Sequence, residues 1–487
     1  MAVALGLVIM AICFAVASRQ WFFAEDFQYL GYVRGTFWFQ PWTWWDVYLP
    51  RLPGFNWAYR PLSFETFYYL GNLAFGLQTF GYLAVSLVFH FASGALLWAT
   101  ALRLGLHRSA SAFTALLSVS RLPSLAEIFF ISISSYVFSK FWMLASLLLA
   151  LHALRQERLT VRRAQCAAAA VATALALLSN ELALATPAVV GAALVGDGRL
   201  GSRRVPWSRI VAQLLPHLVI SAAWCVVRFG VIVLDPRPAV YGPSFGLRTV
   251  LNAVSLLGST LGPGASEVLL LWLLVPAAIL AARPALRALA GEWPLGAALV
   301  GLTWLGAMEA IFAPTLAYQI RFGIAAEVPV CLLIGVGASL AWRCAPPRAG
   351  AALGVAAMLS VVATFPYRAL WSNWSSPRGD TVKAFVELVG RDPAPVGGTV
   401  VLLYHASLTA SNPATNFLYS IKNGAALNAI CPERRLTFDI LDTRDLAQLE
   451  ACSRCMYLAV RPDLSVEVVP DPAVAPPPNR ARRAPGS

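Results

Sequence analysis

Charged residues are scarce in this chain of 487 residues. Only 13% of its positions carry Asp, Glu, Lys or Arg, whereas a soluble globular chain usually carries about 25%. This deficit excludes a soluble protein of several domains joined by polar linkers. Apolar residues make up 58% of the chain, and they recur in runs long enough to cross a membrane. Because a helix needs about 20 apolar residues to span a bilayer, the sequence predicts an all-α polytopic membrane protein.

Two further absences remove other classes of protein. The net charge of +13 is not accompanied by a basic stripe interleaved with stacking aromatics, so we expect no nucleic-acid partner. Lys and Arg gather in the cytoplasmic loops of membrane proteins, which accounts for the charge. The first apolar run, Ala2–Ala17, lacks the basic residues that begin a signal peptide. We therefore interpret this run as a retained span, although its last three residues resemble a cleavage site.

About eleven apolar runs are expected to span the membrane. Besides Ala2–Ala17 they are 80–102, 110–120, 137–154, 164–178, 182–195, 210–233, 268–282, 294–312, 322–342 and 351–365. The apolar stretch 247–261 is followed closely by Gly262-Pro263-Gly264, which predicts a surface or re-entrant helix. Together these runs make residues 1–366 a transmembrane domain.

The loops between the spans predict the orientation. Five short loops rich in Arg fall on one side under this count: 103–108, 155–163, 197–209, 283–292 and 343–348. Positively charged loops mark the cytoplasmic side. We therefore expect a cytoplasmic N-terminus, an extracytoplasmic C-terminus and a location in the inner (plasma) membrane of a bacterium.

Two segments too polar to span fall on the opposite, outer side. Residues 19–72 form a first outer loop dense in Trp and Tyr, where we expect short amphipathic helices at the interface. Residues 367–469 read as a small extracytoplasmic α/β appendage. Its predicted helices are 381–389 and 413–427, and its predicted strands are 400–404 and 456–461. The tail 470–487, rich in Pro, Ala and Arg, is expected to be disordered.

Three of the eight cysteines lie in the appendage. Cys431, Cys452 and Cys455 have a spacing that fits a zinc site poorly. On an oxidising outer face, a disulfide from Cys431 to Cys452 or Cys455 is expected, with free thiols or a metal site as the alternatives.

Carboxylates and arginines at the predicted outer face are candidates for chemistry. Glu25 and Asp26 follow the first span, where burial and a like-charged neighbour would raise a carboxyl pKa and suit a general base. The alternative is an ordinary polar cap. Arg60, in Tyr59-Arg60-Pro61-Leu62, offers a planar fork that matches phosphate oxygens, and its alternative is an interfacial anchor.

Four glutamates lie at or inside apolar runs, where ionisable groups are expensive and often functional. Glu127 and Glu181 fall at outer ends of spans, on the same predicted face as Asp26. Glu309 and Glu327 are interpreted as structural.

These residues together resemble the GT-C superfamily of polytopic glycosyltransferases, and most of all the tetratricopeptide-repeat-containing transmembrane O-mannosyltransferases and their bacterial relatives. The resemblance covers about residues 1–370 and rests on five elements in order. They are Glu25-Asp26-Phe27, Tyr59-Arg60-Pro61-Leu62, Leu122-Pro123…Glu127, Ser179-Asn180-Glu181 with Pro187, and Arg321-Phe322 with Pro329. The family's first Asp is Glu25 here, its His is Leu122 and its Lys is Asn180, and no tetratricopeptide array follows.

The resemblance implies transfer of a sugar from a polyprenyl-phosphate donor to a hydroxyl of a glycan or protein, on the outer face of the membrane. Asp26 or Glu25 would act as the general base. Arg60, with Tyr59 and Arg321, would bind the donor phosphate, and Glu127 and Glu181 would orient the arginines or the sugar. No cofactor is required by this scheme, no metal ligands are assigned, and a divalent cation stays open.

Three other functions compete with this one. A glycan polymerase or ligase would also face outward and use arginine, but it predicts a large outer loop in the later half of the membrane region, which this chain lacks. A transporter or flippase of a lipid-linked or small solute would explain the intramembrane glutamates, but it predicts two related halves, and no such repeat is present. A scaffold that retains the GT-C fold without catalysis is the third alternative, and the change to Glu25 keeps it open.

Overall fold

The computed structural model describes most of the chain. The described residues are 2–22, 25–36, 59–121, 125, 129, 131–199, 204–231, 246–261, 272, 294–313, 323–344, 347–366, 377–391, 397–404, 425–430, 436–442, 454–460 and 466–469. The predicted span 268–282 is outside these ranges apart from Trp272, and the predicted tail 470–487 is wholly outside them.

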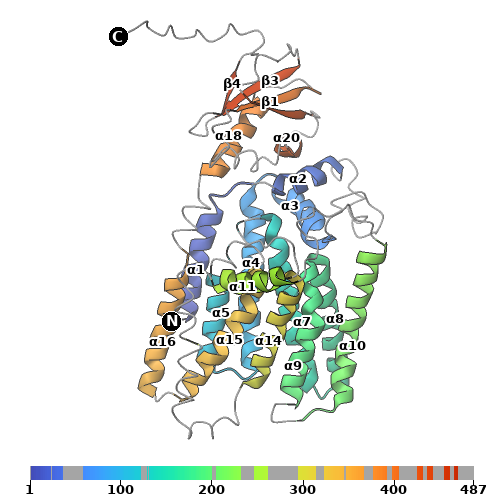
Figure 1. The fold of residues 1–487 in the computed structure, drawn as a ribbon, viewed down its shortest axis with the longest axis vertical. Helices are drawn as coiled ribbons and strands as arrows, with labels where there is room; N and C mark the ends of the chain where they lie inside the picture. The colour runs from blue at the N-terminus through green and yellow to red at the C-terminus, as the bar shows by residue number, and fades with distance from the viewer. Residues whose placement is uncertain are drawn as a thin grey trace. The chain divides into compact units, whose positions relative to one another are not determined.

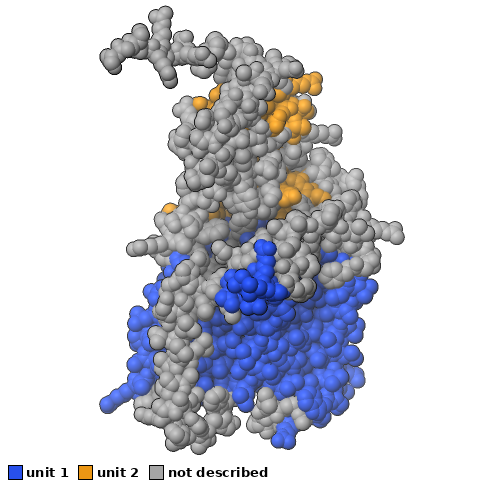
Figure 2. Space-filling view, in the orientation of Figure 1, with its two compact units in different colours: residues 1–17, 45–67, 82–370 blue, residues 18–44, 68–81, 371–487 orange. Residues whose placement is uncertain are grey.

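The chain folds into two compact units, which Figure 2 shows in different colours. The first comprises residues 1–17, 45–67 and 82–370, and the second comprises 18–44, 68–81 and 371–487. Two pieces of the predicted first outer loop therefore group with the C-terminal residues rather than with the helices that flank them. The predicted boundaries 1–366, 367–469 and 470–487 divide the chain into consecutive stretches. Each of the two compact units instead combines segments that are separated in sequence but in contact.

The first unit is a helical bundle (Figure 1). Its α-helices are α1 (Ala2–Ala17), α4 (Thr79–Arg103), α5 (Arg108–Ser120), α7 (Ser134–Arg155), α8 (Leu159–Ser179), α9 (Thr186–Arg199), α10 (Trp207–Cys225), α11 (Leu247–Leu261), α14 (Leu295–Phe312), α15 (Gly323–Cys344) and α16 (Pro347–Thr364). Short π-helices, η2 (Leu62–Thr66) and η5 (Val226–Val231), and 3-10 helices, η3 (Ile131–Ile133) and η4 (Glu181–Ala185), adjoin them.

Seven of the described helices are long and apolar enough to cross a membrane. They are Thr79–Arg103, Ile131–Arg155, Leu159–Ser179, Glu181–Gly198, Trp207–Arg228, Leu295–Phe312 and Ile324–Cys344, and Ala2–Ala17 and Arg348–Thr364 are shorter apolar helices. The chain is an integral membrane protein. Each of these helices matches a predicted span, while the total of eleven and the orientation stay predictions.

The helix α11 is not one of the spans. It packs against α15 and α14, and in Figure 1 it runs across the other helices instead of along them. Val250, Leu251 and Val254 on it are more than half exposed. This arrangement agrees with the prediction of a helix that lies at a surface, and its exposed apolar side chains suit contact with lipid.

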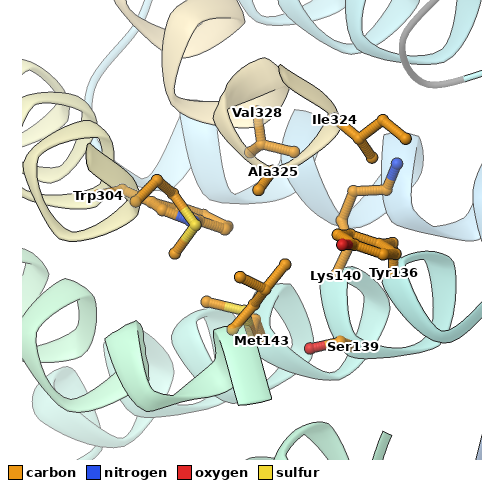
Figure 3. A pocket seen from close by; sticks show the side chains of 10 residues that line it. Tyr136, Ser139, Lys140, Met143, Trp304, Ile324, Ala325 and Val328 are labelled. Carbon is orange, nitrogen blue, oxygen red and sulfur yellow. The ribbon is translucent and has the colours of Figure 1, made fainter. Parts of the chain in front are cut away.

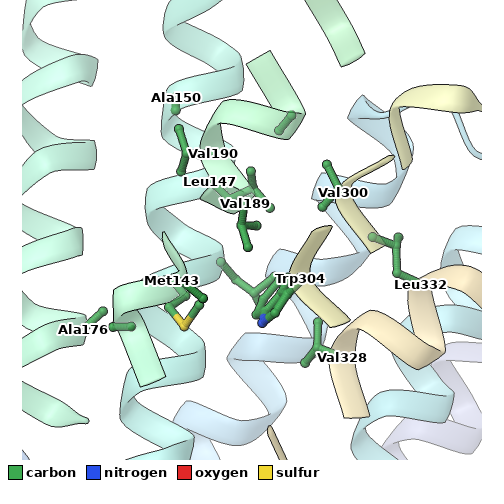
Figure 4. Close-up of a cluster of buried hydrophobic side chains, with 14 of the residues drawn as sticks. Met143, Leu147, Ala150, Ala176, Val189, Val190, Val300, Trp304, Val328 and Leu332 are labelled. Atoms are coloured by element: carbon green, nitrogen blue, oxygen red, sulfur yellow. The ribbon is translucent and has the colours of Figure 1, made fainter. Parts of the chain in front are cut away.

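Small residues and aliphatic side chains pack the bundle. Met143, Val189, Val300 and Trp304 belong to one buried cluster that joins α7, α9 and α14 (Figure 4). A Cβ added to Gly196 of α9 would lie 2.6 Å from the Cα of Gly296 on α14, so the two backbones are in direct contact. Glycines that let helix backbones meet are typical of packing inside membranes.

Arginine contacts gather loops at one end of this bundle. Asp197 accepts a hydrogen bond from Arg155, with Nε and Oδ2 2.9 Å apart, and another from Arg103 at 3.3 Å. Arg343 donates to the carbonyl of Gly105 at 2.5 Å. Four of the five predicted Arg-rich loops thus share one end, and the fifth lies outside the described residues.

The second unit contains a four-stranded sheet and several short helices. Its strands are β1 (Thr399–Tyr404), β2 (Thr437–Asp442), β3 (Cys455–Val460) and β4 (Val466–Val469), and its helices include α2 (Glu25–Thr36), α3 (Phe67–Phe75, without its first residue), α18 (Pro377–Arg391) and α20 (Ala425–Ile430). The strand order is β2-β1-β3-β4. The strand β1 pairs in parallel with β2 and β3, and β4 is antiparallel to β3.

The buried strand β1 could be predicted from its run of apolar residues. Val400 to Leu403 of β1 are at most 5% exposed, as expected for a central parallel strand covered on both faces, and such strands read as continuous apolar runs. The α/β character of the appendage, the helix 381–389 and the strands 400–404 and 456–461 are confirmed. Most of the predicted helix 413–427 lies outside the described residues, and β2 and β4 were not predicted.

Candidate active site

Asp26 is a buried carboxylate in the first turn of α2. Its side chain is 2% exposed, and its Oδ1 accepts a hydrogen bond from the hydroxyl of Tyr68, 2.7 Å away. The ring of Tyr68 stacks on Tyr29, one turn further along α2, with ring centroids 5.3 Å apart. The carboxylate is therefore held by α3 rather than left as a loose polar cap at a helix start. The side chain of the neighbouring Glu25 is not among those described.

Arg60 and Glu181 form a two-pronged ion pair in the first unit. Arg60 Nε donates to one carboxylate oxygen at 2.6 Å and Nη2 to the other at 2.7 Å. Nη1 lies 3.4 Å from the hydroxyl oxygen of Ser135, and the guanidinium also lies over the ring of Phe64. A bidentate pair fixes the plane of the guanidinium as well as its position. One edge of Arg60 is thereby taken by Glu181.

Local hydrogen bonds bring these two residues together across 121 positions of sequence. The hydroxyl of Ser63 donates to the carbonyl of Ser179 at 2.6 Å, which ties η2 to the end of α8. Asn180 ends α8 in an extended conformation, and its side chain accepts from the amide of Leu182 and donates to Ser135. The cap that starts η4 thus also positions the Arg60–Glu181 pair.

A second carboxylate, Glu65, lies in the π-helix that follows Arg60. The amide of Thr66 bonds to the carbonyl of Pro61, the i to i+5 pattern that places Glu65 close to Arg60 along this turn. Glu65 is 9% exposed, and its Oε2 has no hydrogen-bond partner among the described residues. Burial raises its pKa from 4.5 to about 7, against the opposing effects of a backbone hydrogen bond and the charge of Arg60. No role is predicted for Glu65 from the sequence, although its place three residues after the Tyr59-Arg60-Pro61-Leu62 element was a usable signal.

The raised pKa of Glu65 predicts a pH-dependent stability. Between pH 4.5 and about 7 the folded protein keeps a proton that the unfolded chain releases, so the free energy of unfolding falls as pH rises through that window. Glu65→Gln removes this loss, and we expect the variant to be more stable than the wild type at pH 8 by a few kcal/mol and equal to it near pH 4. Thermal unfolding in detergent at both pH values measures this. A wild-type advantage at pH 8 would contradict it.

A buried arginine also acts on this ion pair. Arg228, in the second π-helix η5, is 2% exposed, and its charge interacts favourably with Glu181. Short π-helical segments often occur at functional sites. Arg228 was not predicted as a site residue, because it lies inside the apolar run 210–233 and a single charge does not prevent the prediction of a span.

A further buried ion pair lies between α5 and α15. Arg121 Nη1 donates to Glu327 Oε1 at 3.1 Å, and the two side chains are 2% and 0% exposed. The thiol of Cys331, one turn along α15, lies 3.3 Å from the same carboxylate oxygen. Sequence reasoning placed Glu327 as structural but did not single out Arg121 as its partner.

A small pocket lies between α7, η4, α14 and α15. Tyr136 and Leu182, which line it, directly follow Ser135 and Glu181 in the chain. Figure 3 shows Tyr136 and Lys140 of α7 facing Trp304 of α14 across the space. The wall is otherwise mainly apolar.

The comparisons with known proteins concern the whole chain. No family model and no curated protein sequence matches it. Among solved structures, ArnT from Cupriavidus metallidurans bound to undecaprenyl phosphate has a TM-score of 0.54 at 14% identity, over 95% of this chain and 93% of that one. The apo form of ArnT gives 0.53, and the apo oligosaccharyltransferase of Archaeoglobus fulgidus gives 0.51 at 12% identity, over 88% of this chain and 64% of that one.

The chain has the GT-C fold. The match to ArnT covers 95% of the chain and so includes residues of both compact units. The fold-level prediction is therefore confirmed, while the closer likeness to O-mannosyltransferases stays a prediction.

Of the remaining predicted site residues, Tyr59 is described by the structure, and Glu127 and Arg321 are not. Tyr59 is partly buried and packs against the apolar cluster of the bundle. Within the part of the chain that the structure describes, no group of three or more His, Cys, Asp or Glu side chains is placed to hold a metal ion.

The cysteine prediction is resolved in part. Cys455, at the start of β3, is disulfide-bonded, and Cys431 and Cys452 lie outside the described residues. The proposed pairing with Cys431 therefore stays a prediction.

Proposed function

We propose that the protein is a membrane glycosyltransferase that moves a hexose from a polyprenyl-phosphate donor to an acceptor hydroxyl. The observation that carries this proposal is the match of nearly the whole chain to the ArnT structure that holds undecaprenyl phosphate. The Arg60–Glu181 pair supports it, because a guanidinium held in one plane matches the oxygens of a phosphate. The predicted orientation puts this chemistry on the outer face.

In this reaction Asp26 acts as the general base. Its carboxylate takes the proton from the acceptor hydroxyl, and the resulting oxygen attacks the anomeric carbon of the donor sugar. The bond from that carbon to the phosphate oxygen breaks, and the polyprenyl phosphate leaves with the electron pair. A sugar hydroxyl of a glycan, or a Ser or Thr hydroxyl of a protein, would serve as the acceptor.

The cationic side chains stabilise the leaving phosphate. Glu181 and Ser135 hold the guanidinium of Arg60 in one plane, so its positive charge is fixed in place before charge develops on the phosphate. Arg228 and Lys140 add positive potential nearby. Arg321 and Glu127 keep the roles predicted for them, the first in binding phosphate and the second in orienting the site.

A direct assay tests the proposal. The purified protein is given undecaprenyl-phosphate hexoses one at a time with a panel of glycan and peptide acceptors, and the release of undecaprenyl phosphate is measured. Transfer that depends on protein and acceptor supports the enzyme. Transbilayer movement of the same lipid in proteoliposomes, with no transfer from any donor, would replace it with a flippase.

Arg60→Lys is expected to lower the kcat of transfer about 10²-fold, because lysine keeps the charge but loses the planar, two-pronged geometry. The matched control is Arg391→Lys, which makes the same change in the exposed Arg391–Glu387 pair of α18 and should leave kcat unchanged. Equal rates for the two variants would show that the geometry of Arg60 is not used.

A further inference from the structure

We infer that the C-terminal segment holds the helix that carries Asp26, and that Arg34 is the positioning residue through which it does so. The docking of α20 on α2 stands on geometry alone. Its effect on catalysis rests on the proposed function.

The first observation is a charged cap on α20. Arg34, in the last turn of α2, donates from Nη1 to the carbonyl of Ala429 at 2.9 Å and lies 3.4 Å from the carbonyl of Ile430. These are the last carbonyls of α20, which have no partner inside the helix. A cation at a helix C-terminus also complements the partial negative charge there. Arg34 therefore satisfies the end of α20 in two ways.

The second observation is a close backbone approach at Gly31. A Cβ added at Gly31 would lie 3.5 Å from the backbone of Ala429 and 3.6 Å from its Cβ. Gly31 and Arg34 are three residues apart and so share one face of α2. A Cβ alone at Gly31 would make ordinary van der Waals contact, whereas a bulky side chain such as leucine would push α20 away and break the Arg34 contact. The glycine and the arginine thus form one docking surface.

The docked helix is itself anchored in the C-terminal segment. Ala426, Leu427 and Ala429 of α20 are at most 2% exposed, and α20 also packs against α18. In α2, Asp26 lies eight residues before Arg34, which is about 12 Å along the helix. A tilt of α2 at its Arg34 end therefore moves the carboxylate, and displacements of about 1 Å can cost 10²-fold in rate.

A designed disulfide tests the docking without any need for activity. In the double variant Gly31→Cys/Ala429→Cys the Cβ atoms would lie about 3.6 Å apart, which suits a disulfide. We expect peptide mass spectrometry under non-reducing conditions to find the 31–429 link in most molecules. The control Gly31→Cys/Asp439→Cys, with its second thiol exposed on β2, should form no such link. A folded double variant without the 31–429 link would overturn the docking.

Kinetics then test the positioning role. Arg34→Ala is expected to lower kcat about 10²-fold with the KM for the undecaprenyl-phosphate hexose unchanged, and Arg34→Lys should restore most of kcat, because lysine can also donate to the carbonyls. Hydrogen exchange of the α2 amides should speed up at least 10-fold in Arg34→Ala and not in Arg34→Lys. Unchanged exchange in Arg34→Ala would overturn the positioning role even if no donor is turned over.

Discussion

Replacing Asp26 by asparagine is expected to lower the kcat of sugar transfer by about 10³-fold, within the range usual for a lost general base. The amide has the size of the carboxylate, and its oxygen can still accept the hydrogen bond from Tyr68. It cannot take a proton from the acceptor. The loss should therefore appear in the chemical step, measured as single-turnover release of undecaprenyl phosphate, while thermal unfolding stays close to that of the wild type.

Two further variants interpret that result. Tyr68→Phe keeps the carboxylate and removes its hydrogen-bond donor, so we expect a loss of about 10-fold only. Glu25→Gln should have a small effect if Asp26 is the base. Full activity in Asp26→Asn together with a large loss in Glu25→Gln would transfer the role to Glu25.

Breaking the Arg121–Glu327 pair is expected to cause a large loss of stability. Arg121→Ala leaves a fully buried carboxylate without its cation, which costs about 3–5 kcal/mol in comparable sites. Glu327→Ala should cost a similar amount, because it removes the carboxylate that neutralises the buried guanidinium. The midpoint of thermal unfolding in detergent should fall by about 4 °C in each single variant.

A double variant distinguishes the contribution of the ion pair to stability from that of side-chain packing. Arg121→Met/Glu327→Leu removes both charges and keeps most of the volume, and such replacements of buried ion pairs are often neutral or stabilising. We expect it to recover most of the lost stability. A double variant as unstable as the sum of the single ones would show that the two residues act independently.

The spans could be predicted because membrane solvation leaves a strong signal in the sequence. Each helix of the bundle needs an apolar run, so Thr79–Arg103 and Leu295–Phe312 appear almost at their predicted limits. The strand β2 was missed because it reads Thr-Phe-Asp-Ile-Leu-Asp, with polar residues and too few apolar ones to stand out. Its place in the sheet comes from pairing with β1, which no local pattern reveals.

The candidate site could be predicted only as a set of separate positions. Arg60 and Glu181 were both placed at outer ends of spans, and the resemblance suggested that one orients the other. The bond between them depends on the caps at Ser63 and Asn180, which no linear pattern specifies. Glu65 and Arg228 were not predicted, because one charged residue in a mainly apolar segment does not by itself indicate a function. Their burial and their charged neighbours become known only from the structure.

The contact between Arg34 and Ala429 has a consequence for biosynthesis. Its two residues are 395 positions apart, and nearly the whole set of membrane helices is made between them. At about 5–20 residues per second, α2 leaves the ribosome roughly 20–80 s before α20 exists. During that interval the helix that carries Asp26 lacks its contact with α20. A chain that stops before residue 425 would keep the described membrane helices and lack α20, so the proposed activity would begin only with the last part of translation.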